Sequence, residues 1–238
     1  LDVAVIRVEV SNKQRVLATG GVGIAGDHFD RALFKRAVLP WLGEQVRWGQ
    51  QRLPLPAHLM DALSDWQDAA ALCNRPTLAF IRQAQNNCTE PIRLLALEDY
   101  VSRGYAYDVF ERVEISKVAL SQRRFDVVAF EPSTSAGRGA ISVWQPVTRA
   151  LFESAIAREC RLIREMIVDT LQRADVNANE VQHVIRTGGS SSIPVFIDML
   201  AGLFGRERIV EEDLFTGVAA GLAVRSNPQG SSTHGKSI

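Results

Sequence analysis

Three segments of the chain carry residues whose types and spacing could bind a ligand. The first follows an apolar strand pattern over 181–187, where Gly188 and Gly189 precede the serines Ser190 and Ser192 and a helical pattern over 193–204. Paired glycines let the backbone approach a ligand closely, and a helix start offers free N–H groups to a phosphate or a nucleotide sugar. The segment matches neither a Walker loop nor a Gly-x-Gly-x-x-Gly fingerprint. Taken alone, it fits a serine-capped turn as well as a ligand site.

The second segment is a predicted helix in which Glu114, Lys117 and Ser121 share one edge. At 100° per residue these side chains fall within a sector of about 60°, beside an apolar sector that contains Val109, Val113 and Leu120. Such an edge could hold a ribose and an adenine by hydrogen bonds. The alternative is a solvated edge with a Glu114–Lys117 ion pair, worth a few tenths of a kcal/mol.

The third segment is a glycine loop over 20–30 that joins a predicted strand to a helix running from Phe29 to about Leu42. It contains Gly26, and Asp27 is placed to cap the helix. For His28 we expect a capping or surface role rather than catalysis. The other histidines are scattered, so we assign no metal ligand and no catalytic histidine.

The elements that position these segments alternate between strand and helix, which indicates an α/β protein. The first twenty residues predict a β-hairpin. Residues 48–121 are mainly helical, and strands follow at 125–130 and 140–144. A long helix is predicted over 148–174 and a last short helix over 213–224, before a flexible polar tail at 226–238.

Composition narrows the function classes. The chain has 238 residues, of which 46% are hydrophobic and 23% charged, and 27 basic residues balance 27 acidic ones. This neutrality disfavours nucleic acid and anionic membranes as partners, and no apolar run reaches the roughly 18 residues of a membrane span. Three widely spaced cysteines favour reduced thiols and a cytoplasmic location. Because Leu1 already lies within a strand pattern, we expect a piece of a longer protein.

In their order along the chain, these segments resemble the heat shock protein 70 (DnaK-type) chaperones, specifically the C-terminal half of their ATPase domain. The resemblance rests on the strand 1–6, the Gly26–Asp30 turn, the Glu114-x-x-Lys117-x-x-x-Ser121 helix, the Gly188-Gly189-Ser190-x-x-Ile193-Pro194 turn and the small-residue segment 217–223. It implies lobe II of the actin-like, ribonuclease H-like ATPase fold with an enlarged helical insertion. The nucleotide-binding core would be 1–47 and 122–225, with the strands of 122–147 at the edge of the insertion subdomain 48–121.

The resemblance also implies a nucleotide site with ATP or ADP and Mg²⁺. Glu114, Lys117 and Ser121 match the helix that holds adenosine in the family. Gly26 matches the loop that touches the phosphates, and Asp2 the aspartate that orders the magnesium's waters. Ribose and phosphates would contact the turn residues Gly188, Gly189, Ser190 and Ser192. The family's catalytic groups precede this segment, so we assign no catalytic residue here, and co-chaperones or protein clients would bind through other regions.

Three positions depart from the family pattern. Ser192 stands where an arginine is usual, Val118 where a basic or large residue is usual, and Phe215 where an aspartate is common. The stretch between Asp30 and Glu114 is longer than usual, which suggests the divergent YegD-like branch. Two alternatives to the chaperone ATPase therefore stay open: a non-hydrolysing regulatory or scaffold protein with the same fold, and a sugar-kinase-like relative.

Overall fold

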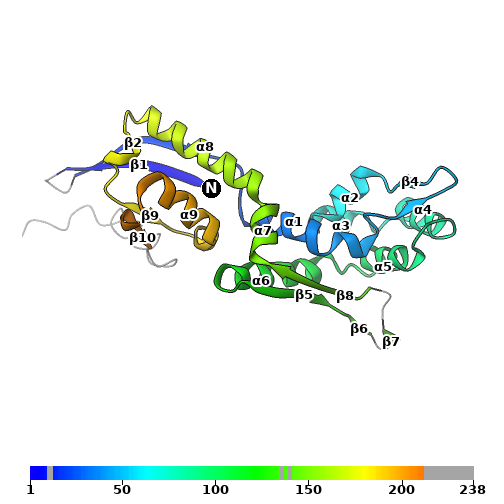
Figure 1. Ribbon diagram of the computed structural model, residues 1–238. Coiled ribbons are helices and arrows are strands. Elements are labelled where there is room, and N and C mark those ends of the chain that lie inside the picture. The colour runs from blue at the N-terminus through cyan, green and yellow to red at the C-terminus, as the bar shows by residue number, and fades with distance from the viewer. Residues whose placement is uncertain (10–12, 135–136, 139–140, 212–238) are drawn as a thin grey trace, which may run out of the picture. The chain divides into compact units, whose positions relative to one another are not determined.

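The computed structural model describes residues 1–9, 13–134, 137–138 and 141–211 (Figure 1). Helices and strands alternate along them, which confirms the mixed α and β composition. The chain divides into two compact units. The first contains Leu1 and Val22–Ile163, and the second contains Asp2–Gly21 and the chain from Arg164 onward.

The first unit is mainly helical. It contains α1 (Gly26–Ala37), η1 (Leu39–Leu42), the small hairpin of β3 (Arg47–Trp48) and β4 (Leu53–Pro54), α2 (Ala57–Leu63), α3 (Trp66–Ala71), α4 (Arg75–Gln85), α5 (Pro91–Ser102) and α6 (Ala106–Gln122). The predicted break near Gly104 is confirmed, since it separates α5 from α6. The prediction for α1 was partly wrong, because Asp27 lies in its first turn and the helix ends before η1. Pro40 explains that end, because it has no N–H to donate to the preceding turn.

A two-stranded antiparallel sheet follows α6 in this unit. β5 (Phe125–Phe130) pairs with β8 (Val143–Thr148), and the short strands β6 (Ser133–Thr134) and β7 (Gly137–Arg138) lie between them in sequence. The second strand was predicted at 140–144. It starts later, because its pairing with β5 begins at Val143, opposite Phe130.

The predicted long helix over 148–174 is two helices, α7 (Arg149–Ala155) and α8 (Ala157–Arg173), with a break at Ile156. The hydroxyl of Thr148 accepts a hydrogen bond from the amide of Leu151, 3.1 Å away, and so caps α7. Side-chain capping of this kind satisfies a free N–H at the helix start. The strand β8 therefore passes into α7 without an intervening loop.

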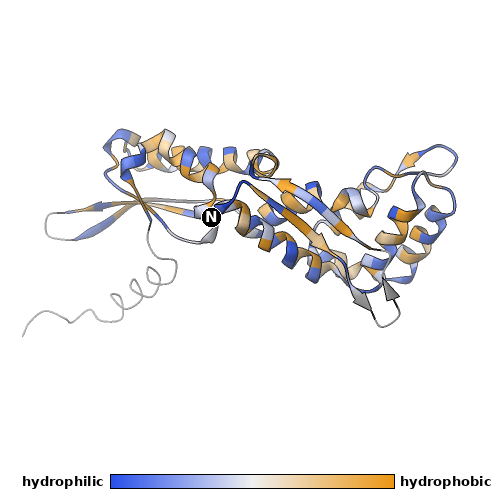
Figure 2. Cartoon of the chain, turned by 60° about the horizontal axis from the view of Figure 1, so that its bottom comes forward, coloured by the Kyte–Doolittle hydropathy of each residue, from blue (hydrophilic) through white to orange (hydrophobic). Residues whose placement is uncertain are grey.

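The core of the first unit forms between amphipathic helices, along which Figure 2 shows hydrophobic and hydrophilic residues interspersed. Phe29, Leu33 and Phe34 place the buried face of α1 against α6. The ring of Phe34 stacks on Phe110 of α6 with centroids 4.6 Å apart. On α6 the buried stripe continues through Val109, Val113 and Leu120. The α1–α6 contact is therefore an apolar interface, and any charge within it needs a partner.

The second unit contains two separate strand pairs and the C-terminal part of α8. β1 (Asp2–Val8) and β2 (Gln14–Gly21) form the predicted hairpin, with a bulge between Val5 and Ile6. β9 (Val184–Arg186) pairs in parallel with β10 (Ile209–Glu211). The remaining elements are η2 (Ala178–Glu180), η3 (Gly189–Ser192), α9 (Pro194–Phe204) and η4 (Arg206–Arg208). The strand predicted at 181–187 is thus shorter, and the predicted helix over 193–204 is confirmed as α9.

Gly20 allows α8 to pack closely on β2. A Cβ placed on Gly20 would lie 2.0 Å from Oγ1 of Thr170, which is fully buried on α8. Arg173 of the same helix donates to the carbonyl of Thr19 at 2.9 Å. The absent side chain at position 20 is therefore a packing requirement of the second unit.

The predicted helix over 213–224, which includes Phe215, and the tail at 226–238 lie outside the described residues. Within the part of the chain that the structure describes, no helix has both the length and the apolar character that crossing a membrane requires.

Candidate functional site

Lys117 lies on the buried face of α6 rather than on a solvated edge. It is only 9% exposed, because it continues the stripe formed by Val113 and Leu120 on the same side of the helix. The ion pair considered from the sequence was with Glu114, on the same helix. Instead, Nζ of Lys117 donates a hydrogen bond to Oδ2 of Asp30 on α1, at 2.7 Å.

Asp30 is a partner that helix periodicity alone did not predict. It is 8% exposed and lies beside Phe29 on the buried face of α1. Its second oxygen, Oδ1, has no hydrogen-bond partner among the described residues. Burial raises the pKa of the Asp30 carboxyl above its ordinary value, although the hydrogen bond from Lys117 lowers it. The ionised carboxylate thus costs free energy in this position, and the hydrogen bond from Lys117 offsets part of that cost.

The other two residues of the predicted edge differ from Lys117 in exposure. Glu114 is exposed, and Ser121 is half-buried. The hydroxyl of Ser121 donates to the carbonyl oxygen of Lys117 at 3.3 Å. The negative charge of Glu114 also raises the pKa of Asp30, which places this carboxylate within electrostatic reach of the ion pair. The predicted edge therefore presents one free carboxylate next to an ammonium that is already paired.

Gly26 joins this group through α1. It is the first residue of the helix, and Asp30 follows one turn later. Nδ1 of His28 accepts a hydrogen bond from the amide of Ala25 at 3.3 Å, which gives that side chain the predicted capping role. In the first unit the structure thus links Gly26, through Asp30, to Lys117.

The second group of predicted residues forms the glycine turn, Gly188–Ser192, in the second unit. Gly188 has φ +88° and ψ 147°, a conformation that favours glycine. Its carbonyl oxygen accepts from both the amide and the hydroxyl of Ser191, at 3.0 and 2.7 Å. Gly189 is exposed, and a Cβ at this position would meet no atom within 4 Å. The backbone of the turn is therefore open to a ligand.

The glycine turn is attached to β9 through Arg186, which lies within the strand predicted from the mostly apolar pattern over 181–187. The guanidinium is buried, and its Nη1 donates to the carbonyl oxygen of Ser191. A single arginine within a short apolar strand is the signal that could have marked it. Ser190 and Ser192 are half-buried on the η3 turn that leads into α9.

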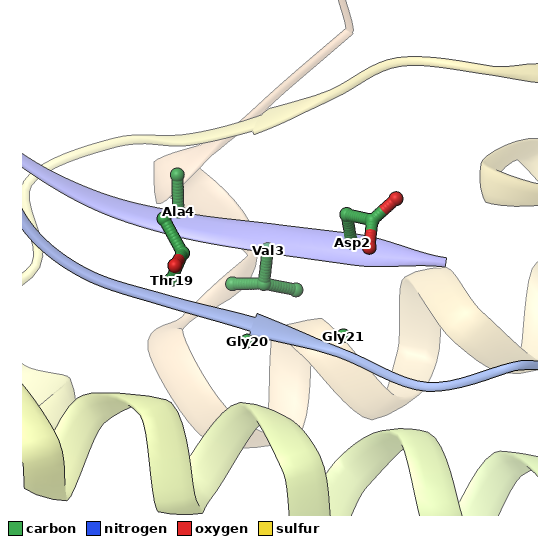
Figure 3. A pocket seen from close by; sticks show the side chains of 6 residues that line it. All are labelled: Asp2, Val3, Ala4, Thr19, Gly20 and Gly21. Atoms are coloured by element: carbon green, nitrogen blue, oxygen red, sulfur yellow. The ribbon is translucent and has the colours of Figure 1, made fainter.

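Asp2, the predicted magnesium residue, is exposed at the start of β1 in the second unit. Figure 3 shows it with Val3 and Ala4 on one strand and Thr19, Gly20 and Gly21 on the other, around an open hollow. Among the residues that the structure describes, no group of three or more His, Cys, Asp or Glu side chains could hold a metal ion directly. A lone carboxylate fits a hydrated Mg²⁺ held mainly by phosphates.

Comparison with known proteins adds the family. The family model "Hsp70 protein" matches residues 104–231, a stretch that includes both α6 and the glycine turn. The "Chaperone protein DnaK" of Mycoplasmopsis synoviae is 26% identical over 130 residues, which is 50% of this chain and 22% of that protein. The "Chaperone protein HscA" of Serratia proteamaculans is 29% identical over 130 residues, which is 54% of this chain and 19% of that protein.

The chain therefore matches about a fifth of the length of these curated relatives. A "Chaperone protein HscA homolog" of Pseudomonas fluorescens is 33% identical over 78 residues, which is 33% of this chain and 12% of that protein. The family match itself covers more than half of the chain, from Gly104 to Ser231. The chain belongs to the Hsp70 protein family.

Proposed function

We propose that this chain is part of the ATPase domain of a heat-shock-type chaperone homologue and supplies the adenosine site and part of the phosphate site. Hsp70 proteins are ATPases with an actin-like fold that bind ATP or ADP with Mg²⁺, and family membership supports the same chemistry here. The alternating helices and strands are consistent with that fold. The observation that carries the proposal is the family match over 104–231, since it contains both α6 and the glycine turn.

In this proposal the α6 edge binds the nucleoside. Glu114 is exposed and available to accept hydrogen bonds from ribose hydroxyls or the exocyclic amine of adenine. The ammonium of Lys117 keeps further donors besides the one that Asp30 accepts. Ser121 adds a hydroxyl one turn further along α6. Together these groups offer both donors and acceptors to a ribose and an adenine.

The glycine turn binds the ribose and the phosphates of the same proposed ligand. Gly188 and Gly189 present backbone without side chains, and Ser190 and Ser192 supply hydroxyls. Gly26, at the start of α1, would contact the phosphates, and Asp2 would order water around a bound Mg²⁺. The bound metal would neutralise charge on the transferring phosphate. Catalytic groups would come from another part of the ATPase domain, so we propose no catalytic residue in this chain.

The placement within the family is also a proposal. We assign the chain to the C-terminal half of the ATPase domain, in the YegD-like branch, with 1–47 and 122–225 as core and 48–121 as the enlarged insertion. Helices α2 to α6 lie largely in this insertion, and their contacts extend to α1, η1, β5 and α7 within the first unit. A cytoplasmic location, and co-chaperones or clients as partners, belong to the same proposal.

Saturation-transfer NMR with Mg·ADP tests the proposed function, because it detects weak binding through the ligand's own protons. We expect transfer to adenine and ribose protons in the wild-type chain and a weaker signal in Glu114→Gln. Glu111→Gln is the matched control, since Glu111 is exposed on the same helix. Transfer to a hexose instead of ADP, or no transfer to ADP, would contradict the proposal.

Turnover separates the chaperone ATPase from the non-hydrolysing alternative. The full-length protein is expected to release phosphate from ATP in a Mg²⁺-dependent reaction. Adenine nucleotide binding without phosphate release would favour the regulatory or scaffold protein that Ser192 and Val118 point to. The adenosine site would then be kept and the hydrolytic function lost.

A further inference from the structure

Arg186 is a buried charge in the second unit. It ends β9 and is only 7% exposed. Burying a guanidinium costs free energy unless its N–H groups find partners. The groups that Arg186 contacts therefore indicate which parts of the second unit its buried guanidinium connects.

The guanidinium of Arg186 contacts two groups, one in the glycine turn and one on β10. Nη1 donates to the carbonyl oxygen of Ser191 in the glycine turn. Nη2 lies 3.4 Å from Oε2 of Glu211, the residue that pairs with Arg186 in the parallel β9–β10 register. The planar fork of a guanidinium can hold two such acceptors at fixed angles. One side chain thus ties the turn to the strand pair that precedes it.

A series of hydrogen bonds connects the turn to Arg186. Its first residue, Gly188, is fixed by the two hydrogen bonds from Ser191. Ser191 is itself fixed by Arg186, whereas Gly189 is exposed and has no packing contact at its Cβ position. Arg186 is therefore a side-chain link between the exposed turn and the buried part of the unit.

We propose that Arg186 is a positioning residue that holds the glycine turn in one conformation before nucleotide binds. The inference rests on the proposed function, because it concerns the part of the turn that would contact ribose and phosphates. A turn that is ordered in advance loses less conformational entropy on binding. Arg186 acts through the Ser191 carbonyl and does not itself contact the ligand.

Amide hydrogen exchange on the chain tests the structural half of this inference. In Arg186→Met we expect the hydrogen-bonded amides of Ser191 and Ile193 to exchange about tenfold faster, since a charge-assisted hydrogen bond that holds the turn is lost. Arg208→Met is the matched control, because Nη1 of Arg208 donates to the carbonyls of Ala178, Asn179 and Val181. That variant should loosen 178–181 and leave the glycine turn unchanged. Unchanged turn exchange in Arg186→Met would overturn the inference.

Two conservative variants keep the test decisive if Arg186→Met unfolds the second unit. Arg186→Lys keeps the charge but cannot hold both acceptors in a fork, and Glu211→Gln keeps the turn contact and removes only the exposed carboxylate. Turn exchange should rise in Arg186→Lys and stay near wild type in Glu211→Gln. Equal exchange in both variants would overturn the inference.

Mg·ADP binding by saturation transfer separates this inference from the proposed function. We expect weaker binding in Arg186→Lys than in the wild type, with the Arg208→Met signal unchanged. If the wild type binds and Arg186→Lys binds equally well, Arg186 has no positioning role and the proposed function stands. If the wild type does not bind, the proposed function fails, while the exchange experiment still decides whether Arg186 orders the turn.

Discussion

The α1–α6 contact and the glycine turn both contain a buried cation, but the partners of the two cations differ in sequence distance. Lys117 reaches Asp30, which lies 87 positions earlier in the chain, on another helix. Arg186 reaches the carbonyl of Ser191, only five positions later, besides its longer contact with the exposed Glu211 on β10. The Lys117–Asp30 contact needs the tertiary fold of its unit, whereas the hydrogen bond from Arg186 to the glycine turn lies within a local segment. The two regions should therefore respond differently to substitution.

The largest effect is expected at the Lys117–Asp30 pair. Lys117→Met should lower the free energy of unfolding of the first unit by about 3–5 kcal/mol, because it leaves a buried carboxylate without its cation. Urea unfolding at neutral pH measures this change. Replacing both partners, in Asp30→Leu with Lys117→Met, should restore most of the stability. If Lys117→Met alone is as stable as the wild type, the pair is not buried in solution.

A smaller effect is expected from closing the space at Gly20 in the second unit. Gly20→Ala should cost about 1–3 kcal/mol, because the new Cβ would collide with the hydroxyl of Thr170. Gly202→Ala on α9 is the control, since a Cβ there meets nothing within 4 Å and alanine favours a helix. Thermal unfolding should therefore separate the two variants in opposite directions. Equal losses of thermal stability in the two variants would show that α8 and β2 are not closely packed at Gly20.

Two substitutions in the glycine turn separate the effect of backbone strain on stability from the effect of an added side chain on ligand binding. Gly188→Ala should cost about 1–2 kcal/mol, because its φ of +88° disfavours a Cβ. Gly189→Ala should change stability by less than about 0.5 kcal/mol, since the added methyl group has open space. Both should weaken Mg·ADP binding if the ligand lies on this backbone. Unimpaired binding in Gly189→Ala would place the nucleotide elsewhere.

The smallest expected effect is a pH dependence from Asp30. Its pKa is raised above 3.8 mainly by burial, so the folded state holds the proton more strongly than the unfolded state does. Stability should therefore fall as pH rises from about 4 through the raised pKa and then level off. Asp30→Asn lacks this contribution, so the stability of the wild type relative to Asp30→Asn should decrease over the same window. Urea unfolding at a series of pH values measures the difference, and a constant difference would contradict the raised pKa.

The same contrast explains what the sequence could predict. Periodicity located α6 and α9, and the glycine pair located the turn, because these features depend on neighbouring residues. The partner of Lys117 was not predictable in this way, because burial of an i, i+3 edge depends on α1 packing against it. Asp30 within the apolar face of α1 was the available signal. Likewise, Arg186 in an apolar strand indicated a specific contact without revealing which backbone oxygen it would bind.

The central proposal is that the chain binds an adenine nucleotide, with contacts proposed in α6 of the first unit and in the glycine turn of the second. The most direct measurement is an amide NMR titration of the chain with Mg·ADP. We predict that resonances of Glu114–Ser121 and of Gly188–Ser192 shift together, with a single dissociation constant. Shifts confined to one of the two segments, or two unrelated dissociation constants, would contradict the account.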